Sequence, residues 1–162
     1  MTDHVAHILD QWSVERPDLD VSPIGLIGRL HRLAARLTDE LNTVYRQYGL
    51  AEGDFDALVT LRRQGAPFAL TCSALAGSTM ITSGGMTKRI DRLVAAGLVR
   101  RRDSESDGRS RLVELTAAGR ELVDDAFTAH VANEHRLVAA LDAGERERLT
   151  QIVTDWLDRL ER

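Results

Sequence analysis

The sequence contains a single cysteine, Cys72, and no long apolar run. One cysteine excludes an internal disulfide framework and a four-cysteine zinc site. No stretch approaches the roughly 20 apolar residues that a membrane-spanning helix needs, and the N-terminus has no apolar run of the signal type. We therefore expect a cytoplasmic protein whose thiol chemistry would depend on Cys72 alone.

Motifs of catalysis are also missing. The sequence has no phosphate-binding glycine loop, no nucleophile elbow, and no cysteine and histidine set at metal-ligand spacing. His4 and His7 form a close pair, but histidines on a terminal helix are more often solvated. His130 and His135 are five residues apart, a poor spacing for chelation on a helix. We therefore predict neither an enzyme nor a metal or cofactor site.

The chain lacks an overall excess of positive charge, because its formal net charge is −4. The charge is unevenly distributed. Residues 86–111 carry 8 Lys and Arg against 4 Asp and Glu, whereas 1–85 carry 7 against 10 and 112–162 carry 6 against 11. One basic segment on an acidic background suits contact with phosphates at a single surface. On charge alone, a solvated basic face is an equally good interpretation.

Apolar spacing, caps and stop signals predict mostly helices. A chain of 162 residues, 43% of them apolar, fits one domain or one compact unit with an additional helical layer. The expected helices cover about 5–12, 22–49, 53–64, 71–76, 83–97, 116–141 and 142 to the end, and the expected strands cover 98–102 and 109–115. The expected N-caps are Ser22, Thr71, Thr116 and Asp142. A helix pair followed by a hairpin predicts a mainly α fold with a small β-wing, a winged helix-turn-helix.

The last helix carries an apolar stripe that one subunit leaves uncovered. The stripe consists of Leu149, Ile152, Val153, Trp156, Leu157 and Leu160. Little chain remains to pack against it, so a partner subunit is the natural cover. We therefore expect a homodimer with a helical dimerisation region over 21–49 and 116–162. An additional N-terminal helix and loop would occupy 1–20, and the winged helix-turn-helix would occupy 50–115.

The expected helix that begins near residue 83 has two contrasting faces. One face holds Met86, Ile90, Leu93 and Val94, and we expect it to pack inward. The opposite face holds small or polar residues and two cations, a composition that suits entry into a DNA groove. Glycines at the helix start let backbone N–H groups approach a phosphate or base edge closely, although a plain turn is the alternative interpretation. The predicted DNA contacts of this helix are Ser83, Gly84, Gly85, Thr87, Lys88 and Arg92.

The expected hairpin adds a second basic element. Arg109 follows the Asp107-Gly108 tip, where an arginine can enter a narrow minor groove. Asp107, Arg109 and Val113 resemble the Asp-x-Arg-x-x-x-Val wing motif of the MarR family of regulators. The recognition segment and Leu115-Thr116-Ala-Ala-Gly119 are similar to that family in order and spacing. The resemblance covers nearly the whole chain and implies a dimer that binds a pseudo-palindromic operator of double-stranded DNA, with repression as the expected effect.

Within the family, the sequence resembles the urate-responsive PecS/UrtR branch. The resemblance implies a small anionic aromatic or purine ligand, such as urate, whose binding releases DNA. The positions that match its ligand-response residues are Trp12, Asp56, Arg89 and Arg101. A planar anionic purine suits such a set, because it needs an aromatic face, a guanidinium and a carboxylate. The alternatives are that Trp12 only anchors its helix and that Asp56 and Arg89 form a structural ion pair.

Two other functions compete with this interpretation. Cys72 lies at the start of a short helix, where a lowered thiol pKa would allow redox sensing, but a small half-buried residue is the commoner role there. A dimeric adaptor without DNA binding would keep the helices and would not need the basic helix and wing. A gel-shift titration distinguishes an adaptor from a regulator.

Overall fold

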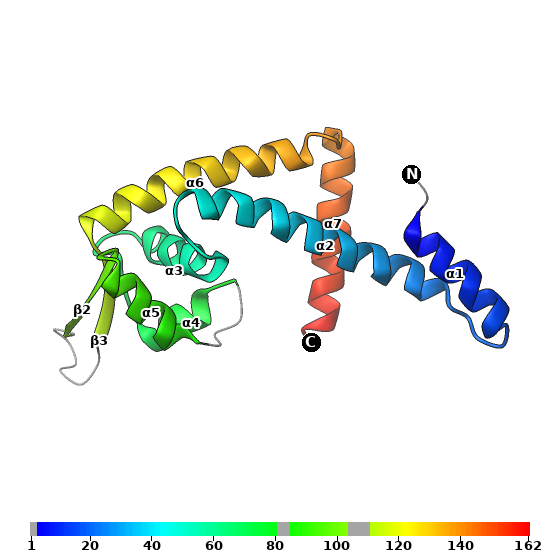
Figure 1. Ribbon diagram of the computed structural model, residues 1–162, viewed down its shortest axis with the longest axis horizontal. Coiled ribbons are helices and arrows are strands. Elements are labelled where there is room, and N and C mark those ends of the chain that lie inside the picture. Colours follow the sequence, from blue (N-terminus) through cyan, green and yellow to red (C-terminus); the bar gives the residue numbers. More distant parts are fainter. Residues whose placement is uncertain (1–2, 81–84, 104–110) are drawn as a thin grey trace. The chain divides into compact units, whose positions relative to one another are not determined.

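The computed structural model describes residues 3–80, 85–103 and 111–162. These residues form seven helices and three short strands (Figure 1). The helices are α1 (His4–Glu15), α2 (Ser22–Gln47), α3 (Glu52–Arg63), α4 (Cys72–Ser78), α5 (Met86–Ala95), α6 (Ala117–Val138) and α7 (Ala143–Leu160). The strands are β1 (Ala69–Thr71), β2 (Val99–Asp103) and β3 (Arg111–Leu115). The expected mainly α fold with a small β-wing is confirmed.

The helix starts follow the predicted caps with one exception. The side chains of Thr71 and Thr116 accept hydrogen bonds from the first turns of α4 and α6, and Asp142 forms a capping box with Glu145 at the start of α7. The prediction of Ser22 as an N-cap is wrong, because Ser22 already lies in α2 and its N–H donates to the Asp20 carboxylate at 3.0 Å. The carboxylate two residues earlier is the better acceptor at this terminus.

The sheet contains a strand that the sequence did not predict. The strand order is β1-β3-β2, with both pairings antiparallel. The additional strand β1 pairs Leu70 with Val113 of β3, while Arg101 of β2 pairs with Val113 from the other side. At three residues β1 is too short to show an alternating pattern. Its last residue, Thr71, is also the cap of α4, and that helix signal was the stronger one.

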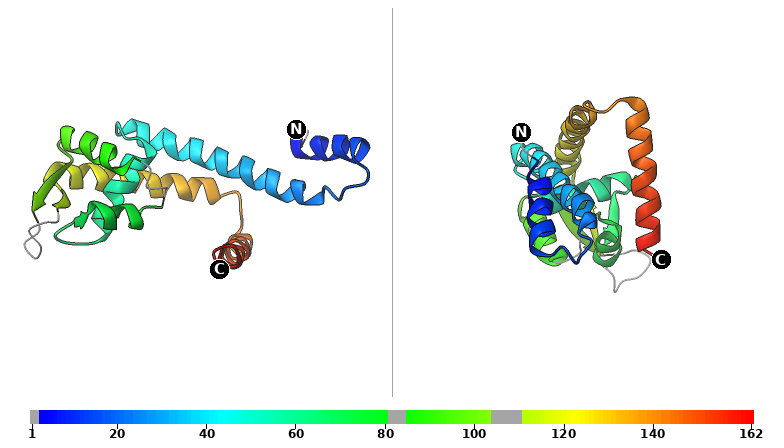
Figure 2. Two further views of the ribbon diagram at one scale, coloured as in Figure 1. Left: turned by 90° about the horizontal axis from the view of Figure 1, so that it is seen from below. Right: turned by 90° about the vertical axis from the view of Figure 1, so that its right-hand side faces the viewer.

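The chain divides into two compact units, Met1–Glu40 and Leu41–Arg162. The second unit holds the main hydrophobic core, in which side chains of α3, α4, α5 and α6 pack with those of the sheet. Its buried members are Tyr45, Leu50, Phe55, Ala57, Leu58, Leu61, Leu75, Met86, Ile90, Leu93, Val99, Val113, Leu115, Val123 and Ala126. Within this unit α6 runs from the sheet to the turn before α7 (Figures 1 and 2).

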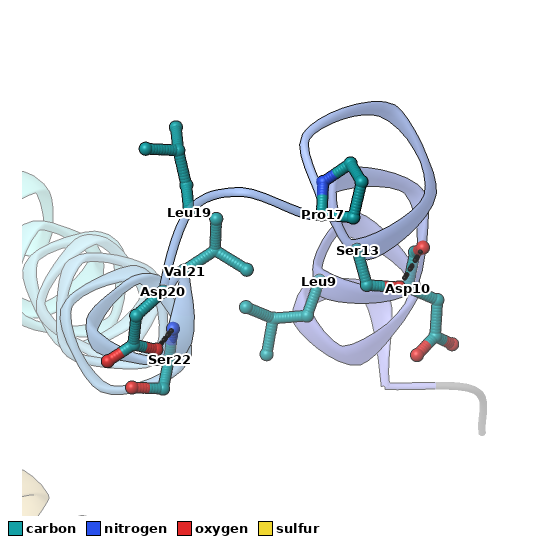
Figure 3. Close-up of a pocket in the computed structure, with 8 residues that line it drawn as sticks. All are labelled: Leu9, Asp10, Ser13, Pro17, Leu19, Asp20, Val21 and Ser22. Atoms are coloured by element: carbon teal, nitrogen blue, oxygen red, sulfur yellow. Dashed lines mark hydrogen bonds between the residues drawn. The ribbon is translucent and has the colours of Figure 1, made fainter.

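In the first unit, α1 packs on the start of α2 at Gly25 and Gly28. Val5 is buried, and a Cβ at Gly28 would lie 3.4 Å from its side chain, so the helices approach closely there. Arg29 of α2 forms an ion pair with Asp3, the N-cap of α1. Figure 3 shows the small pocket of about 430 Å³ beyond this contact, into which Leu9 of α1 projects.

The last helix, α7, buries none of its residues. Figure 1 shows it standing apart from the sheet and from α3, α4 and α5 of the same unit. Five large apolar residues on it are exposed: Leu149, Ile152, Val153, Leu157 and Leu160. Among the described residues, no helix is both long and apolar enough to cross a membrane.

Candidate nucleic-acid interface

Helix α5 has the two faces that its sequence predicts. Met86, Ile90 and Leu93 are buried in the core, whereas Thr87 and Lys88 are exposed on the other side. Gly85 precedes the helix with φ +80°, a left-handed conformation that a side chain would strain. Gly85 is therefore required by the turn itself. The remaining predicted contacts before it, Ser83 and Gly84, lie outside the described residues.

An acidic residue of α3 contacts this helix, and the sequence analysis missed it. The Asp54 carboxylate accepts a hydrogen bond from Nη2 of Arg92 at 2.8 Å, and its Oδ1 lies 3.9 Å from Nε of Arg89. The Asp54 and Arg89 side chains are 12% and 13% exposed, whereas that of Arg92 is 60% exposed. Arg92 is thus tied to α3 while most of its surface faces solvent. The only sequence signal for this contact was an aspartate in the first turn of a helix, and helix capping explains an aspartate at that position equally well.

The Arg89 guanidinium fills the space next to Gly53, where any other residue would place its Cβ. A Cβ on Gly53 would lie 2.2 to 2.6 Å from the guanidinium atoms of Arg89. The guanidinium therefore lies directly over the first turn of α3, next to Asp54. This contact joins α5 to α3 through a charged side chain instead of apolar packing alone.

The three consecutive arginines of β2 are divided between its two sides, as strand geometry requires. Arg100 and Arg102 both reach Glu114 of β3, at 2.8 and 2.7 Å. The hydrogen bond from Arg100 holds the pKa of the Glu114 carboxyl below its usual range. Arg101 points the other way and pairs with Asp91 of α5 at 2.7 Å. The strand and the exposed side of α5 are thereby linked.

The wing motif is described only in part. Val113 is fully buried in the centre of the sheet, which explains an apolar residue at this position. Asp107 and Arg109 lie outside the described residues. The predicted minor-groove contact of Arg109 therefore stays a prediction.

The four predicted ligand residues lie in different surroundings. Trp12 belongs to the first unit, is 45% exposed, and is not among the described residues that line the pocket of Figure 3. In the second unit, Arg89 lies over Gly53 beside Asp54, and Arg101 pairs with Asp91. Asp56 is buried at 7% exposure and faces a second pocket. Asp54 and Asp56 project to different sides of α3 because they are two residues apart on a helix.

This second pocket has a volume of about 650 Å³. Residues of α2, α3 and α6, with Met80, line it: Leu41, Tyr45, Glu52, Phe55, Asp56, Val59, Arg62, Arg63, Met80, Asp124, Phe127, His130 and Glu134. The rings of Tyr45 and Phe55 stack with their centroids 4.2 Å apart. The Tyr45 hydroxyl lies 3.2 Å from Nδ1 of His130, whose Nε2 lies 3.2 Å from Glu134.

The residues of the competing hypotheses have ordinary surroundings. Cys72 is a free, half-buried cysteine that packs against the core at the start of α4. Within the described residues, no group of three or more His, Cys, Asp and Glu side chains could hold a metal ion.

Comparison with known sequences identifies the family. The model of the MarR family matches residues 48–110, which include α3, α4, α5 and β2. The chain is 38% identical over 149 residues to the HTH-type transcriptional regulator PecS of Dickeya dadantii, covering 92% of this chain and 90% of the relative. The chain belongs to the MarR family. It is also 29% identical over 133 residues to the transcriptional repressor MprA of Escherichia coli, covering 80% of this chain and 73% of that protein.

Solved MarR structures share this winged helix-turn-helix. AbsC, a MarR family transcriptional regulator of Streptomyces coelicolor, is 28% identical with a TM-score of 0.74 and covers 88% of this chain and 97% of its own. Another regulator of that organism, in complex with DNA, is 25% identical with a TM-score of 0.74, covering 89% and 91% of the two chains. A mutant MarR of Escherichia coli complexed with operator DNA is 25% identical with a TM-score of 0.72, covering 86% and 99%. The expected likeness to MarR regulators, including PecS, is confirmed.

Proposed function

We propose that this protein is a dimeric, ligand-responsive repressor that binds a pseudo-palindromic DNA operator. The observation that carries the proposal is the exposed side of α5, where Thr87 and Lys88 face solvent and Arg92 is mostly exposed above a buried apolar face. Relatives of this chain are named as transcriptional regulators and repressors, and two similar structures are complexes with DNA. In this proposal α5 enters the major groove, and Arg109 reaches the neighbouring minor groove.

Lys88 allows a direct test because it is the only lysine in the chain. A lysine-acylating reagent has two targets, the Lys88 amine and the N-terminal amine, and mass spectrometry distinguishes them. We expect DNA of the promoter beside the protein's own gene to protect Lys88 and leave the N-terminal amine reactive. Equal acylation of Lys88 with and without bound DNA would place it outside the interface.

Substitution measures the contribution of the same residue. Lys88→Gln should weaken operator binding and lower the slope of log affinity against log salt by about 0.9, the value for one lost phosphate contact. Arg148→Gln on α7 removes the same charge from a helix that Figure 1 shows apart from α5, and its slope should equal that of the wild type. Equal slopes for all three proteins would contradict the proposed contact.

The uncovered apolar stripe of α7 supports the proposed dimer. We propose that residues 21–49 and 116–162 form the dimerisation region, with 1–20 as an additional helix and 50–115 as the DNA-binding region. Leu157→Arg should yield monomers in analytical ultracentrifugation, because it places a charge in the apolar stripe. Gln151→Arg adds the same side chain elsewhere on α7 and should leave the dimer intact. A dimeric Leu157→Arg protein would rule out this interface.

The ligand in this proposal is a small anionic aromatic molecule such as urate, with Trp12, Asp56, Arg89 and Arg101 as the responding residues. The similarity to PecS and the position of Arg89 support it. An anion bound at Arg89 would draw the guanidinium away from Asp54 and so loosen the contact between α3 and α5, which lowers DNA affinity.

Urate, xanthine and salicylate titrated into the DNA complex test this response. We expect urate to release DNA from the wild type and from Arg100→Ala, whose lost partner is Glu114. Arg89→Ala also lacks the contact with Asp54, so without urate it should bind DNA more weakly than the wild type, and urate should cause little further release. An unchanged urate response in Arg89→Ala would show that Arg89 is not part of the ligand site.

A further inference from the structure

Another pocket lies at the base of the wing, where β2 and β3 meet the start of α6 (Figure 1). Its volume of about 380 Å³ is within the range of sites that bind small molecules. None of the residues assigned above to the urate-like ligand is among the described residues that line it. The lining of this wing-base pocket includes Phe68, Arg100, Glu114, Leu115, Ala117 and Arg120.

Glu114 carries the only carboxylate among the described residues of this lining. Its oxygens lie 2.8 Å from Nη2 of Arg100 and 2.7 Å from Nε of Arg102. Two guanidiniums therefore share a single negative charge, and this group as a whole is positive. The Glu114 side chain is 13% exposed, so solvent screens these charges less than it would at an open surface.

Arg120 adds a positive charge that no carboxylate neutralises. Its guanidinium carbon lies 5.7 Å from the centroid of the Phe68 ring, and it forms no ion pair within the described part of the chain. Arg62 lies over the same ring at 5.1 Å, but its charge is cancelled by the ion pair with Asp124. Counted with the two arginines at Glu114, three guanidiniums face one carboxylate, which leaves a net charge of +2.

Two unneutralised charges suit an anion that itself carries two charges. Guanidiniums bind phosphate oxygens through paired N–H groups, and these charge-assisted hydrogen bonds are strong. A phosphate monoester is a dianion above its second pKa of about 6, whereas a phosphodiester of the DNA backbone carries one charge. Leu115 and Ala117 add apolar surface to the lining, where the organic group of a small monoester has room.

We propose that the wing-base pocket binds a phosphate monoester, whose phosphate group is held by Arg120 and Arg100. Arg100 donates to Glu114 through Nη2, which leaves its other N–H groups for the ligand. Bound in this way, the ligand joins β2 to α6. It differs from the urate-like anion both in its chemistry and in the residues that hold it.

Three small probes separate charge from shape. Methyl phosphate is a dianion at pH 8, methyl sulfate is a monoanion with the same tetrahedral head, and dimethyl phosphate is a monoanion that resembles the DNA backbone. Calorimetric titration of the full-length protein at pH 8 should show methyl phosphate binding about tenfold more tightly than either monoanion. Absence of methyl phosphate binding, or equal affinity for a monoanion, would overturn the proposal.

The same titration at pH 5 changes the charge of the probe and leaves that of the pocket unchanged. Methyl phosphate then carries a single charge, because its second pKa is about 6. The arginines stay charged, and the hydrogen bond from Arg100 holds the pKa of the Glu114 carboxyl below its usual range. The preference for methyl phosphate over methyl sulfate should therefore largely disappear. A preference that is equally strong at pH 5 would contradict recognition of the second charge.

Two substitutions should change the affinity in opposite directions. Arg120→Gln should weaken methyl phosphate binding by about fivefold or more, whereas Arg148→Gln on α7 removes the same charge elsewhere and should not. Glu114→Gln should strengthen the binding, because the pocket loses its negative charge. Damage to the fold would weaken binding in both pocket variants. Equal affinity in Arg120→Gln and Arg148→Gln, or weaker binding in a folded Glu114→Gln protein, would overturn the proposal.

This proposal and the repressor proposal fail independently. Arg89→Ala should keep the wild-type affinity for methyl phosphate, because Arg89 is not among the described residues of the lining. Arg120→Gln should keep the wild-type dependence of operator binding on salt. A slope lower by about 0.9 in Arg120→Gln would assign Arg120 to a DNA phosphate and overturn the monoester site. Operator binding is measured by gel shift, so a protein that fails to bind methyl phosphate can still confirm the repressor.

Discussion

Replacing Gly119 with alanine should destabilise the protein, although alanine is normally the better helix residue. Gly119 lies in the first turn of α6, where its N–H donates to the capping hydroxyl of Thr116. A Cβ at this position would lie 1.9 Å from the backbone oxygen of Leu98. That oxygen is itself held by the N–H of Thr116 at 3.1 Å, so it cannot turn aside.

The magnitude follows from two opposing effects. Alanine gains roughly 0.5–1 kcal/mol of helix propensity over glycine. Ordinary van der Waals contact begins near 3.4 Å, so α6 and the backbone before β2 would have to separate by about 1.5 Å. Overpacking of this kind costs about 1–3 kcal/mol and sometimes more, and here no flexible side chain can absorb it. We expect a net loss of about 2 kcal/mol in the free energy of unfolding.

Gly144 provides the control, because it lies in the first turn of α7 after a similar cap and its Cβ would meet nothing closer than 3.4 Å. Urea denaturation at one protein concentration compares both variants with the wild type, since the stability of the proposed dimer would depend on concentration. Gly144→Ala should be equal to the wild type or more stable. A Gly119→Ala protein as stable as the wild type would refute the close approach of α6 to Leu98.

Two further predictions concern buried charge. Asp54→Asn should lower the free energy of unfolding, measured in urea, by about 1–3 kcal/mol, because Arg89 loses its buried carboxylate partner. Asp91→Asn breaks an exposed ion pair and should cost less than about 1 kcal/mol. Equal losses in the two variants would contradict this ranking. The pKa of Tyr45 is raised to about 12 in the folded protein, whereas that of an unfolded tyrosine is near 10.0, so between these pH values unfolding releases a proton. The free energy of unfolding should therefore fall by about 2–3 kcal/mol as the pH rises from 10.0 to about 12. Tyr45→Phe should lack this decrease when the stability of both proteins is measured against pH.

Much of the secondary structure could be predicted because its signals are local. Thr71, Thr116 and Asp142 cap their helices through hydrogen bonds within three residues along the chain. The inward side of α5 followed from the spacing of Met86 and Ile90, since helical periodicity places residues four apart on one face. Strand β1 could not be predicted, because its hydrogen-bond partners lie in β3, more than forty residues later.

The sequence by itself determined the helices, the apolar side of α5 and the excess of arginine beside it, because composition and periodicity depend only on neighbouring residues. Only the tertiary structure decided how the charged side chains are paired. Asp54 and Asp56 are both aspartates and lie two residues apart in the sequence. The packing of α5 on α3 nevertheless places Asp54 against Arg89 and Arg92, whereas Asp56 lines a pocket with aromatic residues. Whether two charged groups form an ion pair depends on the distance between them, and residues far apart in the sequence come close only when the helices pack.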